Sequence, residues 1–370
     1  MAKKIVLVTG GAGFIGSHTA DALAKKGYVV RILDSLQAEV HGGRWPKYLD
    51  KKYEKIRGDV REKKVWDKAL KGVFAVYHLA AYQDQRLDFS KFFTTNTVST
   101  ALLYECIVEK SLPVKKVVVA SSQFVYGDGE YRYKKGSKWE SFYPFLRSLE
   151  QFEKGEWDIK GPRGEKTEHL PFKESQPVFP TNSYGLSKYA LEMTAIRLGK
   201  TYNIPTIAFR YSIVQGERQS PKNLYSGAMR IFVSQALSGV PITVYEDGLS
   251  KRDFVNVHDV VSANIKPLED SRMDYEVFNV GSGRAYTVLE FAEAVKRVTK
   301  SDSPIVLGGF RRTDTRNAVS DISKLLALGW KPQRTIEDSI TAYVSWFKKE
   351  GWDKKVDKKA LLSLRKGITK

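Results

Sequence analysis

The chain of 370 residues is long enough for one large α/β domain that carries a smaller lobe. Hydrophobic residues make up 42% of it and aromatic residues 12%, which excludes a disordered chain. The single cysteine, Cys106, excludes a disulfide framework and a cysteine-based zinc site. The first apolar run is too short for a signal-peptide core, and no stretch is long enough to span a bilayer. We therefore expect a cytoplasmic protein without a membrane partner.

The charge of the chain is strongly basic. Lysine and arginine total 61 against 42 acidic residues, a net charge of +19. Such a balance favours phosphate-bearing ligands or nucleic acid as partners. The lysines are spread along the chain, whereas nucleic-acid binding needs a concentrated basic stripe. Nucleic acid is therefore the less favoured partner.

Strand and helix patterns alternate over the first 125 residues. Expected strands cover 5–9, 28–33, 53–57, 73–79 and 116–121, with helices over 17–26, 62–71 and 96–110 between them. Alternation of this kind predicts an α/β fold of the Rossmann type, a doubly wound parallel sheet with helices on both faces. We assign 1–209 to this nucleotide-binding domain.

The alternation breaks over about 128–180, where aromatic residues and prolines indicate a packed insertion. A helix over 184–202 and a strand over 206–209 follow. The chain after Arg210 is expected to be loop-rich, with short strands at 242–245, 254–257 and 277–280 and helices over 287–298 and 335–347. We assign 210–350 to a substrate-binding lobe partly interleaved with the sheet. The remaining 351–370 form a basic C-terminal segment.

A glycine-rich motif, Thr9–Gly16, lies between the first strand and the first helix. Gly10 permits a tight turn, Gly13 lets a pyrophosphate approach the backbone, and Gly16 lets the helix pack against the strand. Asp34 ends the second strand, where a carboxylate binds the ribose hydroxyls of a dinucleotide. That carboxylate would repel a 2′-phosphate, which favours NAD. Two nearby basic residues, Arg31 and Arg44, leave NADP open.

A tyrosine and a lysine, Tyr184 and Lys188, lie four residues apart on one face of an expected helix. A free phenol has a pKa near ~10, and a cation one turn away would favour the phenolate. Ser122 follows a buried strand at the sheet edge where ligands collect, and it could hydrogen-bond the reacting oxygen. The three residues together predict proton transfer at a substrate hydroxyl.

These motifs, in this order, resemble the extended short-chain dehydrogenases/reductases of the nucleotide-sugar epimerase and dehydratase group. Further matching pieces are Gly58–Val60, His78–Ala81, Val125–Gly127, Arg252–Val255, His258–Val260 and Leu328–Trp330. The resemblance implies a homodimer through paired helices, here 96–110 and 184–202. It also implies the cofactor-binding residues Gly10, Gly13, Phe14, Ile15, Gly16, Asp34, Ser35, Asp59, Val60, Leu79, Ala80, Ala81, Asn96, Ser121, Tyr184, Lys188 and Tyr211.

Two residues beside Ser122 bear on the reaction. Relatives that eliminate water carry an acidic pair here, whereas this chain has Gln123 and Phe124, which cannot serve as acid or base. We therefore expect epimerisation at C4 of a nucleoside-diphosphate sugar through a 4-keto intermediate. The segments 223–227 and 245–248 resemble the branch acting on deoxysugar nucleotides such as dTDP-rhamnose. Ile213 replaces the substrate-binding asparagine usual in the group, which leaves the sugar open.

Arginine forks match phosphate oxygens, so Arg218, Arg252 and Arg316 are the candidates for holding the diphosphate. Together with Gln83, Ser122 and Gln123 they form the expected substrate site. The five histidines show no metal-ligand spacing, and we expect no metal.

Two alternatives remain. One is a nucleotide-sugar reductase or dehydrogenase with net redox, which would exchange its cofactor freely. The other is a redox-inactive binding protein of the same fold, for example one that binds RNA, which the charge of +19 motivates. The intact Ser122, Tyr184 and Lys188 favour the enzyme.

Overall fold

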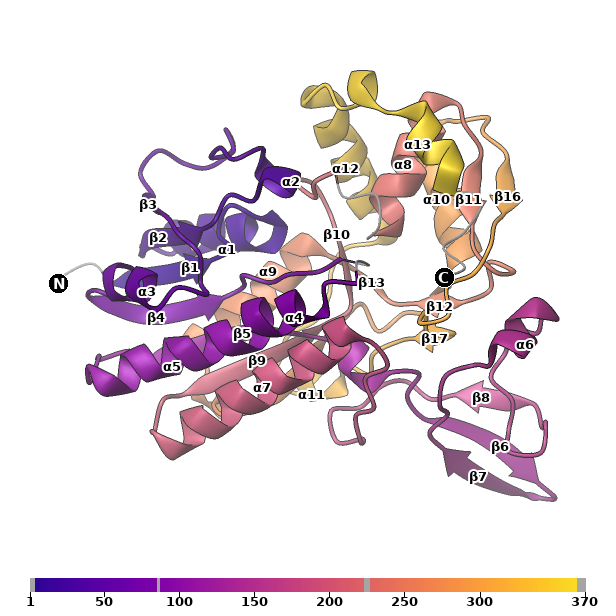
Figure 1. Cartoon of the computed structure of the whole chain (residues 1–370), viewed down its shortest axis with the longest axis horizontal. Coiled ribbons are helices and arrows are strands. Elements are labelled where there is room, and N and C mark those ends of the chain that lie inside the picture. The colour runs from indigo at the N-terminus through magenta and orange to yellow at the C-terminus, as the bar shows by residue number, and fades with distance from the viewer. Residues whose placement is uncertain (1–3, 85–86, 223–226, 365–370) are drawn as a thin grey trace.

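Apolar runs rich in β-branched residues form the central parallel sheet of the protein. The computed structural model describes residues 4–84, 87–222 and 227–364 (Figure 1). The strand order in the sheet is β14-β9-β5-β4-β1-β2-β3. These strands are β1 (Ile5–Thr9), β2 (Val29–Asp34), β3 (Glu54–Arg57), β4 (Val73–His78), β5 (Lys116–Ser122), β9 (Thr206–Tyr211) and β14 (Val277–Val280).

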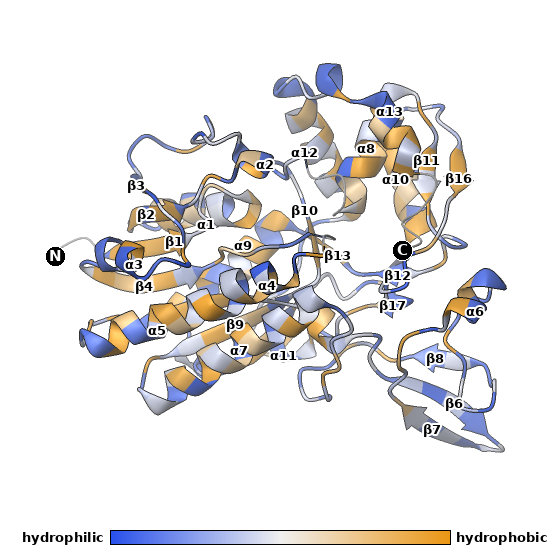
Figure 2. Cartoon of the chain, in the orientation of Figure 1, coloured by the Kyte–Doolittle hydropathy of each residue, from blue (hydrophilic) through white to orange (hydrophobic). Residues whose placement is uncertain are grey.

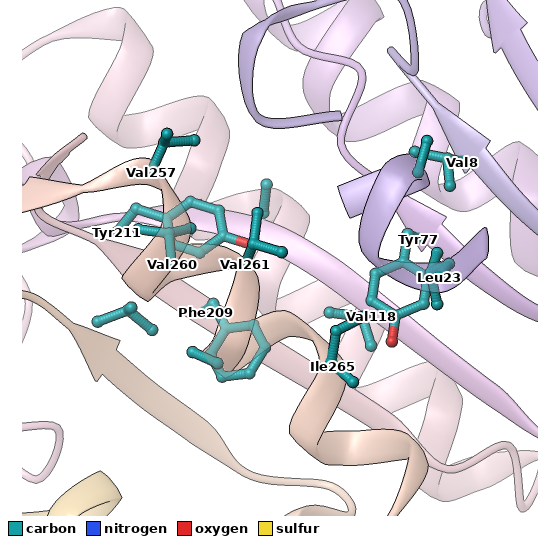
Figure 3. Close-up of a cluster of buried hydrophobic side chains, with 14 of the residues drawn as sticks. Val8, Leu23, Tyr77, Val118, Phe209, Tyr211, Val257, Val260, Val261 and Ile265 are labelled. Atoms are coloured by element: carbon teal, nitrogen blue, oxygen red, sulfur yellow. The ribbon is translucent and has the colours of Figure 1, made fainter. Parts of the chain in front are cut away.

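Helices cover both faces of this sheet, each through its own apolar cluster. One face carries α1 (Phe14–Lys25), α9 (Val257–Ile265) and α11 (Ser323–Leu326), and Figure 3 shows Leu23 of α1 and Val260, Val261 and Ile265 of α9 in this cluster. The other face carries α3 (Lys63–Ala69), α5 (Ser99–Glu109) and α7 (Ser183–Thr201). The sheet is therefore buried on both sides, as its apolar strands require.

Short elements surround the sheet. They are α2 (Ala38–His41), α4 (Phe89–Phe92), the π-helical turn η1 (Phe93–Val98), η2 (Gln123–Tyr126), η3 (Lys266–Leu268) and η4 (Ser271–Met273). The strand pair β10 (Ile213–Gln215) and β13 (Phe254–Asn256) leads from the sheet into a second lobe.

The second lobe has its own apolar core, formed by three helices packed on a two-stranded parallel sheet. The helices are α8 (Ala228–Ser238), α10 (Val288–Thr299) and α12 (Ile336–Lys349), and the strands are β11 (Ile242–Val244) and β16 (Ile305–Leu307). A three-stranded sheet of β12 (Lys251–Arg252), β15 (Tyr286–Thr287) and β17 (Asn317–Ala318) lies beside them. The described part of the C-terminal segment adds η5 (Asp353–Lys355) and α13 (Lys358–Ser363).

The insertion folds as an antiparallel sheet of β6 (Tyr131–Lys135), β7 (Lys138–Phe142) and β8 (Thr167–His169). Helix α6 (Leu149–Glu153) lies between β7 and β8 in the chain. It packs on the second lobe. The Phe152 and Phe310 rings stack with centroids 4.7 Å apart. Arg147 and Glu246 form a buried ion pair at 2.8 Å. The insertion is thus tied to the lobe that faces the sheet.

Two predictions about secondary structure were wrong in detail. The stretch after Arg210 contains two helices, α8 and α9, that its loop-rich reading missed. The predicted strand over 254–257 ends on Val257, the first residue of α9, and the valines that follow fit a strand as well as a helix. The helix predicted over 96–110 is part of a longer helical stretch, in which α4, the π-helical turn η1 and α5 follow one another from Phe89 to Glu109. Helix α10 was predicted, over 287–298, and Figure 2 shows that α8 and α10 both carry hydrophobic residues.

Candidate active site

A cavity of about 1220 Å³ opens at the carboxyl ends of the sheet strands and runs to the second lobe. Its wall includes Gly10 after β1, Asp34 at the end of β2, Leu79 after β4, Ser122 at the end of β5 and Tyr211 at the end of β9. This is where ligands of open α/β sheets bind. The cavity wall contains every predicted site residue except Asn96 and Arg316.

The glycine turn leaves no room for side chains. A Cβ on Gly10, whose φ is +65°, would lie 2.8 Å from the Ala80 Cα, and one on Gly16 would lie 2.2 Å from the Gly10 oxygen. Gly13 caps α1 without a side-chain hydrogen bond, so the helix N-terminus offers free N–H groups to the cavity. These features fit the diphosphate of a dinucleotide.

Asp34 is held beside this turn. Its carboxylate accepts hydrogen bonds from Ala12 N at 3.0 Å and Leu36 N at 2.8 Å. Arg31, one of the residues that left NADP open, donates to Glu54 and to two carbonyl groups and does not line the cavity. Arg44 does line it. The surroundings of Asp34 therefore favour ribose hydroxyls over a 2′-phosphate.

Tyr184 stands in the first turn of α7, close to Ser122. Asn182 caps the helix, with its side chain accepting from Gly185 N at 2.9 Å. Gly185 lets the helix approach η2, since a Cβ there would lie 2.5 Å from the Phe124 oxygen. The Tyr184 and Phe124 rings meet edge to face at 5.9 Å. A glycine contact thus sets the distance between the phenol and the end of β5.

Burial dominates the electrostatics of this pair. Burial raises the pKa of Tyr184 to about 12, and a hydrogen bond with Ser122 opposes the rise. Burial lowers the pKa of Lys188 to about 7. The Lys188 ammonium donates to the Ala120 oxygen at 2.6 Å and lies 5.8 Å from the Tyr184 ring centre. The two groups are thus positioned together in a water-poor site.

Asn96 acts behind the cavity wall. Its side chain accepts from Tyr82 N at 2.8 Å and donates to the Tyr82 oxygen at 3.1 Å and to Ser187 Oγ at 2.9 Å. It therefore joins the chain beside Gln83 to the residue before Lys188. Asn96 holds the wall in place without lining it.

Ser121 connects β5 to a buried polar network. Its hydroxyl donates to Glu192 at 2.7 Å, and Glu192 forms a buried ion pair with Arg210 at 2.6 Å. Arg210 also donates to the Tyr126 hydroxyl at 2.7 Å. Fully bonded networks of this kind fix local geometry. The strand end that carries Ser122 is therefore anchored from beneath.

Gln123 is buried in the cavity wall. Among the described residues, neither polar atom of its carboxamide has a hydrogen-bond partner. A buried amide without partners is costly, so it suits a polar ligand group in the cavity. Gln83 lines the cavity as well.

The three candidate arginines are placed differently. Arg218 lines the cavity and pairs with Asp21 at 2.8 Å. Arg252 lines the cavity and donates to the carbonyl groups of residues 251, 315 and 316. The Arg316 guanidinium is buried outside the cavity and bonds Asp158, Glu246 and Asp247. This placement favours a structural role for Arg316.

Sequence reasoning missed two arginines in the cavity wall, Arg230 and Arg311. Arg311 lies over the Tyr245 ring at 4.9 Å, and its buried Nε has no hydrogen-bond partner among the described residues. The sequence signal that could have identified Arg311 is the pair Arg311-Arg312 ahead of Asp314. Arg311 lies five residues before Arg316, the arginine that was predicted to bind the diphosphate. The stretch 223–226, one basis for the deoxysugar branch, lies outside the described residues.

The histidines do not all behave as isolated packing residues. His78 is buried and bonds Thr9 and Ser99 at 2.8 and 3.0 Å. His18 and His258, which are 240 residues apart in the sequence, meet with ring centres 5.1 Å apart. Spacing along the sequence could not show this pairing.

The parallel sheet and the glycine turn define the class, a dinucleotide-binding fold of the Rossmann type. The NAD dependent epimerase/dehydratase family model matches residues 6–150 and 160–281, and the chain belongs to this family. The chain is 32% identical to dTDP-L-rhamnose 4-epimerase of Burkholderia thailandensis, over 94% of this chain and 96% of that protein.

Two solved structures share the fold. UDP-glucose 4-epimerase of Thermotoga maritima with UDP-glucose is 28% identical, with a TM-score of 0.76 over 94% of this chain and 99% of that one. The NAD complex of UDP-glucose 4-epimerase from Thermus thermophilus is 27% identical, with a TM-score of 0.74 over 93% and 99%. These relatives are isomerases. None of the helices in the described ranges is long and apolar enough to cross a bilayer.

Proposed function

We propose that this protein inverts C4 of a nucleoside-diphosphate sugar. The observation that carries the proposal is the placement of Ser122, Tyr184 and Lys188 on one wall of a cavity that also reaches Arg252 and Arg311. Bound NAD supplies reversible hydride transfer at the sugar carbon. The phosphate end of the sugar nucleotide is held by guanidinium groups across the cavity.

Tyr184 takes the proton of the sugar 4-hydroxyl and later returns it. Ser122 donates a hydrogen bond to the same sugar oxygen. Before the sugar binds, this hydroxyl bonds Tyr184 instead and favours its phenolate. Lys188 supplies positive charge within the buried site when protonated. The pKa near 7 makes that charge available at neutral pH. Inversion would require the 4-keto sugar to turn over in the cavity, so that its opposite face would meet the cofactor.

Epimerisation is favoured over elimination because the residues after Ser122 are not acids. Phe124 packs on the Tyr184 ring, and Gln123 offers an amide. Neither can exchange the proton that loss of water requires. The likeness to dTDP-L-rhamnose 4-epimerase supports a dTDP-deoxysugar as the substrate. Ile213, which lines the cavity in place of the usual asparagine, marks the contact that differs.

The direct test is incubation with UDP-, dTDP-, GDP- and CDP-sugars, scored by NMR for inversion at C4. We expect one or more deoxysugar nucleotides to be inverted, and Tyr184→Phe to lose about 10²–10⁴-fold in rate while keeping its NAD. A reductase would instead consume added NADH or NADPH. Absence of inversion with the whole panel, or wild-type turnover in Tyr184→Phe, would refute the proposal.

We also propose a homodimer through α7 and the η1–α5 segment, which lie side by side (Figure 1). Val98 is 46% exposed and Leu186 is 45% exposed on these elements. Exposed apolar side chains gathered on adjacent helices suit a self-complementary contact. Light scattering should show a dimer, and Val98→Glu with Leu186→Glu should give a monomer. A monomeric wild type would contradict it.

A further inference from the structure

A cluster of three possible metal ligands lies outside the cavity wall. His18 comes from α1, His258 from the start of α9, and Glu217 from the segment after β10. One ligand atom from each lies within 4.8 Å of the other two. His258 Nε2 is 2.8 Å from Glu217 Oε1, and His18 Nε2 is 3.9 Å from the same oxygen. The cluster joins the nucleotide-binding sheet to the chain entering the second lobe.

Gly216 brings Glu217 into this position. Its φ is +155°, and a Cβ there would lie 2.5 Å from Val257 Cγ1 and 3.7 Å from the Phe14 ring. Only glycine lets the chain pass between the two helices at this point. The next residue, Glu217, therefore enters the gap between His18 and His258.

One oxygen of the Glu217 carboxylate is unsatisfied in the part of the chain that the structure describes. Glu217 Oε2 is buried and has no hydrogen-bond partner among the described residues. The hydrogen bond from His258 satisfies only the other oxygen, Oε1. A buried carboxylate oxygen without a partner is costly, and a cation beside it removes the cost.

We propose that His18, Glu217 and His258 form a binding site for a divalent transition-metal ion of the zinc class. Two imidazoles and one carboxylate are ligands that zinc accepts, whereas Mg²⁺ and Ca²⁺ prefer oxygen. Each imidazole binds through Nε2 with its proton on Nδ1, so His18 gives up its 3.1 Å contact with the Glu217 carbonyl oxygen and His258 gives up its 2.8 Å hydrogen bond to Glu217 Oε1. A water molecule completes four-fold coordination.

The site needs only a small contraction. Zinc ligands lie about 2.0–2.2 Å from the ion, so atoms up to 4.8 Å apart must draw together. His258 can make this movement because its side chain is 41% exposed, whereas that of His18 is 5% exposed. The positive charge of Arg218 acts on His18, and Arg218 is paired with Asp21 at 2.8 Å. The exposed side of His258 also gives the ion its way in.

A bound ion would stabilise one wall of the cavity, although it lies outside that wall. Glu217 directly precedes Arg218, which lines the cavity with φ at +67° and lies over the Tyr48 ring. Fixing Glu217 to α1 and α9 fixes the backbone that carries Arg218. Metal binding therefore stabilises the junction of the two lobes.

The test uses the full chain without a histidine tag, stripped with a chelator and dialysed against Zn²⁺. We expect one Zn²⁺ per chain, with Glu217→Gln and His258→Gln each weakening binding at least about tenfold. Glu269→Gln, an exposed carboxylate paired with Lys26, is the matched control and should bind as wild type does. Thermal unfolding should shift upward with Zn²⁺ in wild type and control only, and Mg²⁺ should shift neither.

His18 is left unchanged because it is buried, and its replacement could unfold the chain. Absorption of a Co²⁺-loaded sample, which reports four-coordinate geometry, gives a second readout that does not depend on stability. Zinc binding that survives both Glu217→Gln and His258→Gln would place the ion elsewhere and overturn the proposal. So would a wild-type chain that binds no Zn²⁺ in dialysis.

Discussion

The contact at Gly185 gives a sharp test of how Tyr184 is positioned. In Gly185→Ala, the new Cβ would lie 2.5 Å from the Phe124 oxygen, whereas ordinary contact begins at 3.4 Å. The start of α7 must therefore retreat from η2 by about 0.9 Å. A misplacement of this size near the reacting atoms lowers catalytic rates by about 10²-fold. We expect a loss of about 10- to 100-fold in kcat, with NAD still bound.

A second glycine on the same helix provides the matched control. In Gly199→Ala, the new Cβ would lie 2.4 Å from Thr206 Oγ1 and 2.8 Å from the Ile204 oxygen, an equal clash. Gly199 lies 14 residues further along α7, about 21 Å from Gly185 at the usual helical rise. Both substitutions overpack by about 1–3 kcal/mol, so both should lower Tm. Only Gly185→Ala should lower kcat by more than a few-fold.

The assay follows C4 inversion by NMR with the best sugar nucleotide of the panel, together with NAD content and Tm. The reasoning would be refuted by a folded Gly185→Ala enzyme with wild-type kcat. Equal losses of kcat in both variants would refute it as well, because the effect would then be general destabilisation.

Three further predictions address charge. The pKa of Lys188 is about 7 in the folded protein against 10.5 for a free lysine, so the unfolded chain binds more protons than the folded one between these pH values. The NAD-free wild type should therefore become more stable relative to Lys188→Met, by up to a few kcal/mol, as the pH rises from 7 to 9. Urea unfolding at both pH values checks this, and a constant difference would contradict it. Arg311→Ala should raise KM for the sugar nucleotide by about tenfold or more at unchanged Tm. Arg316→Ala should instead lower the free energy of unfolding by about 3–5 kcal/mol, because it strips a buried cation from Glu246 and Asp247, and a differential scanning measurement separates the two arginines.

The sequence revealed the parts of the site that depend on local geometry. The turn at Gly10–Gly16 and the four-residue spacing of Tyr184 and Lys188 need only one strand or one helix to be meaningful. Their position at the carboxyl ends of parallel strands followed from the alternation of strands and helices. The strand order and the two-faced packing have the form that this alternation predicts.

Features that depend on tertiary partners could not be read in this way. The sequence alone does not distinguish Arg316 from Arg311 as a ligand-binding residue. Only the fold shows that the Arg316 guanidinium is already paired with acidic side chains. His18 and His258 are brought together by the packing of α1 on α9. Helix α9 itself was hidden, because its valines satisfy a strand pattern as well as a helix pattern.

The position of β14 has a consequence for how the chain is made. This strand, from residues 277–280, completes the sheet beside β9, and α9 supplies part of the apolar cover over α1. A nascent chain that ends near residue 209 therefore has a bare strand edge and an uncovered apolar face. Folding of the nucleotide-binding half must wait until about seventy more residues leave the ribosome, a long-range closure that slows folding and exposes the intermediate to aggregation. Truncation at 209 should yield insoluble protein.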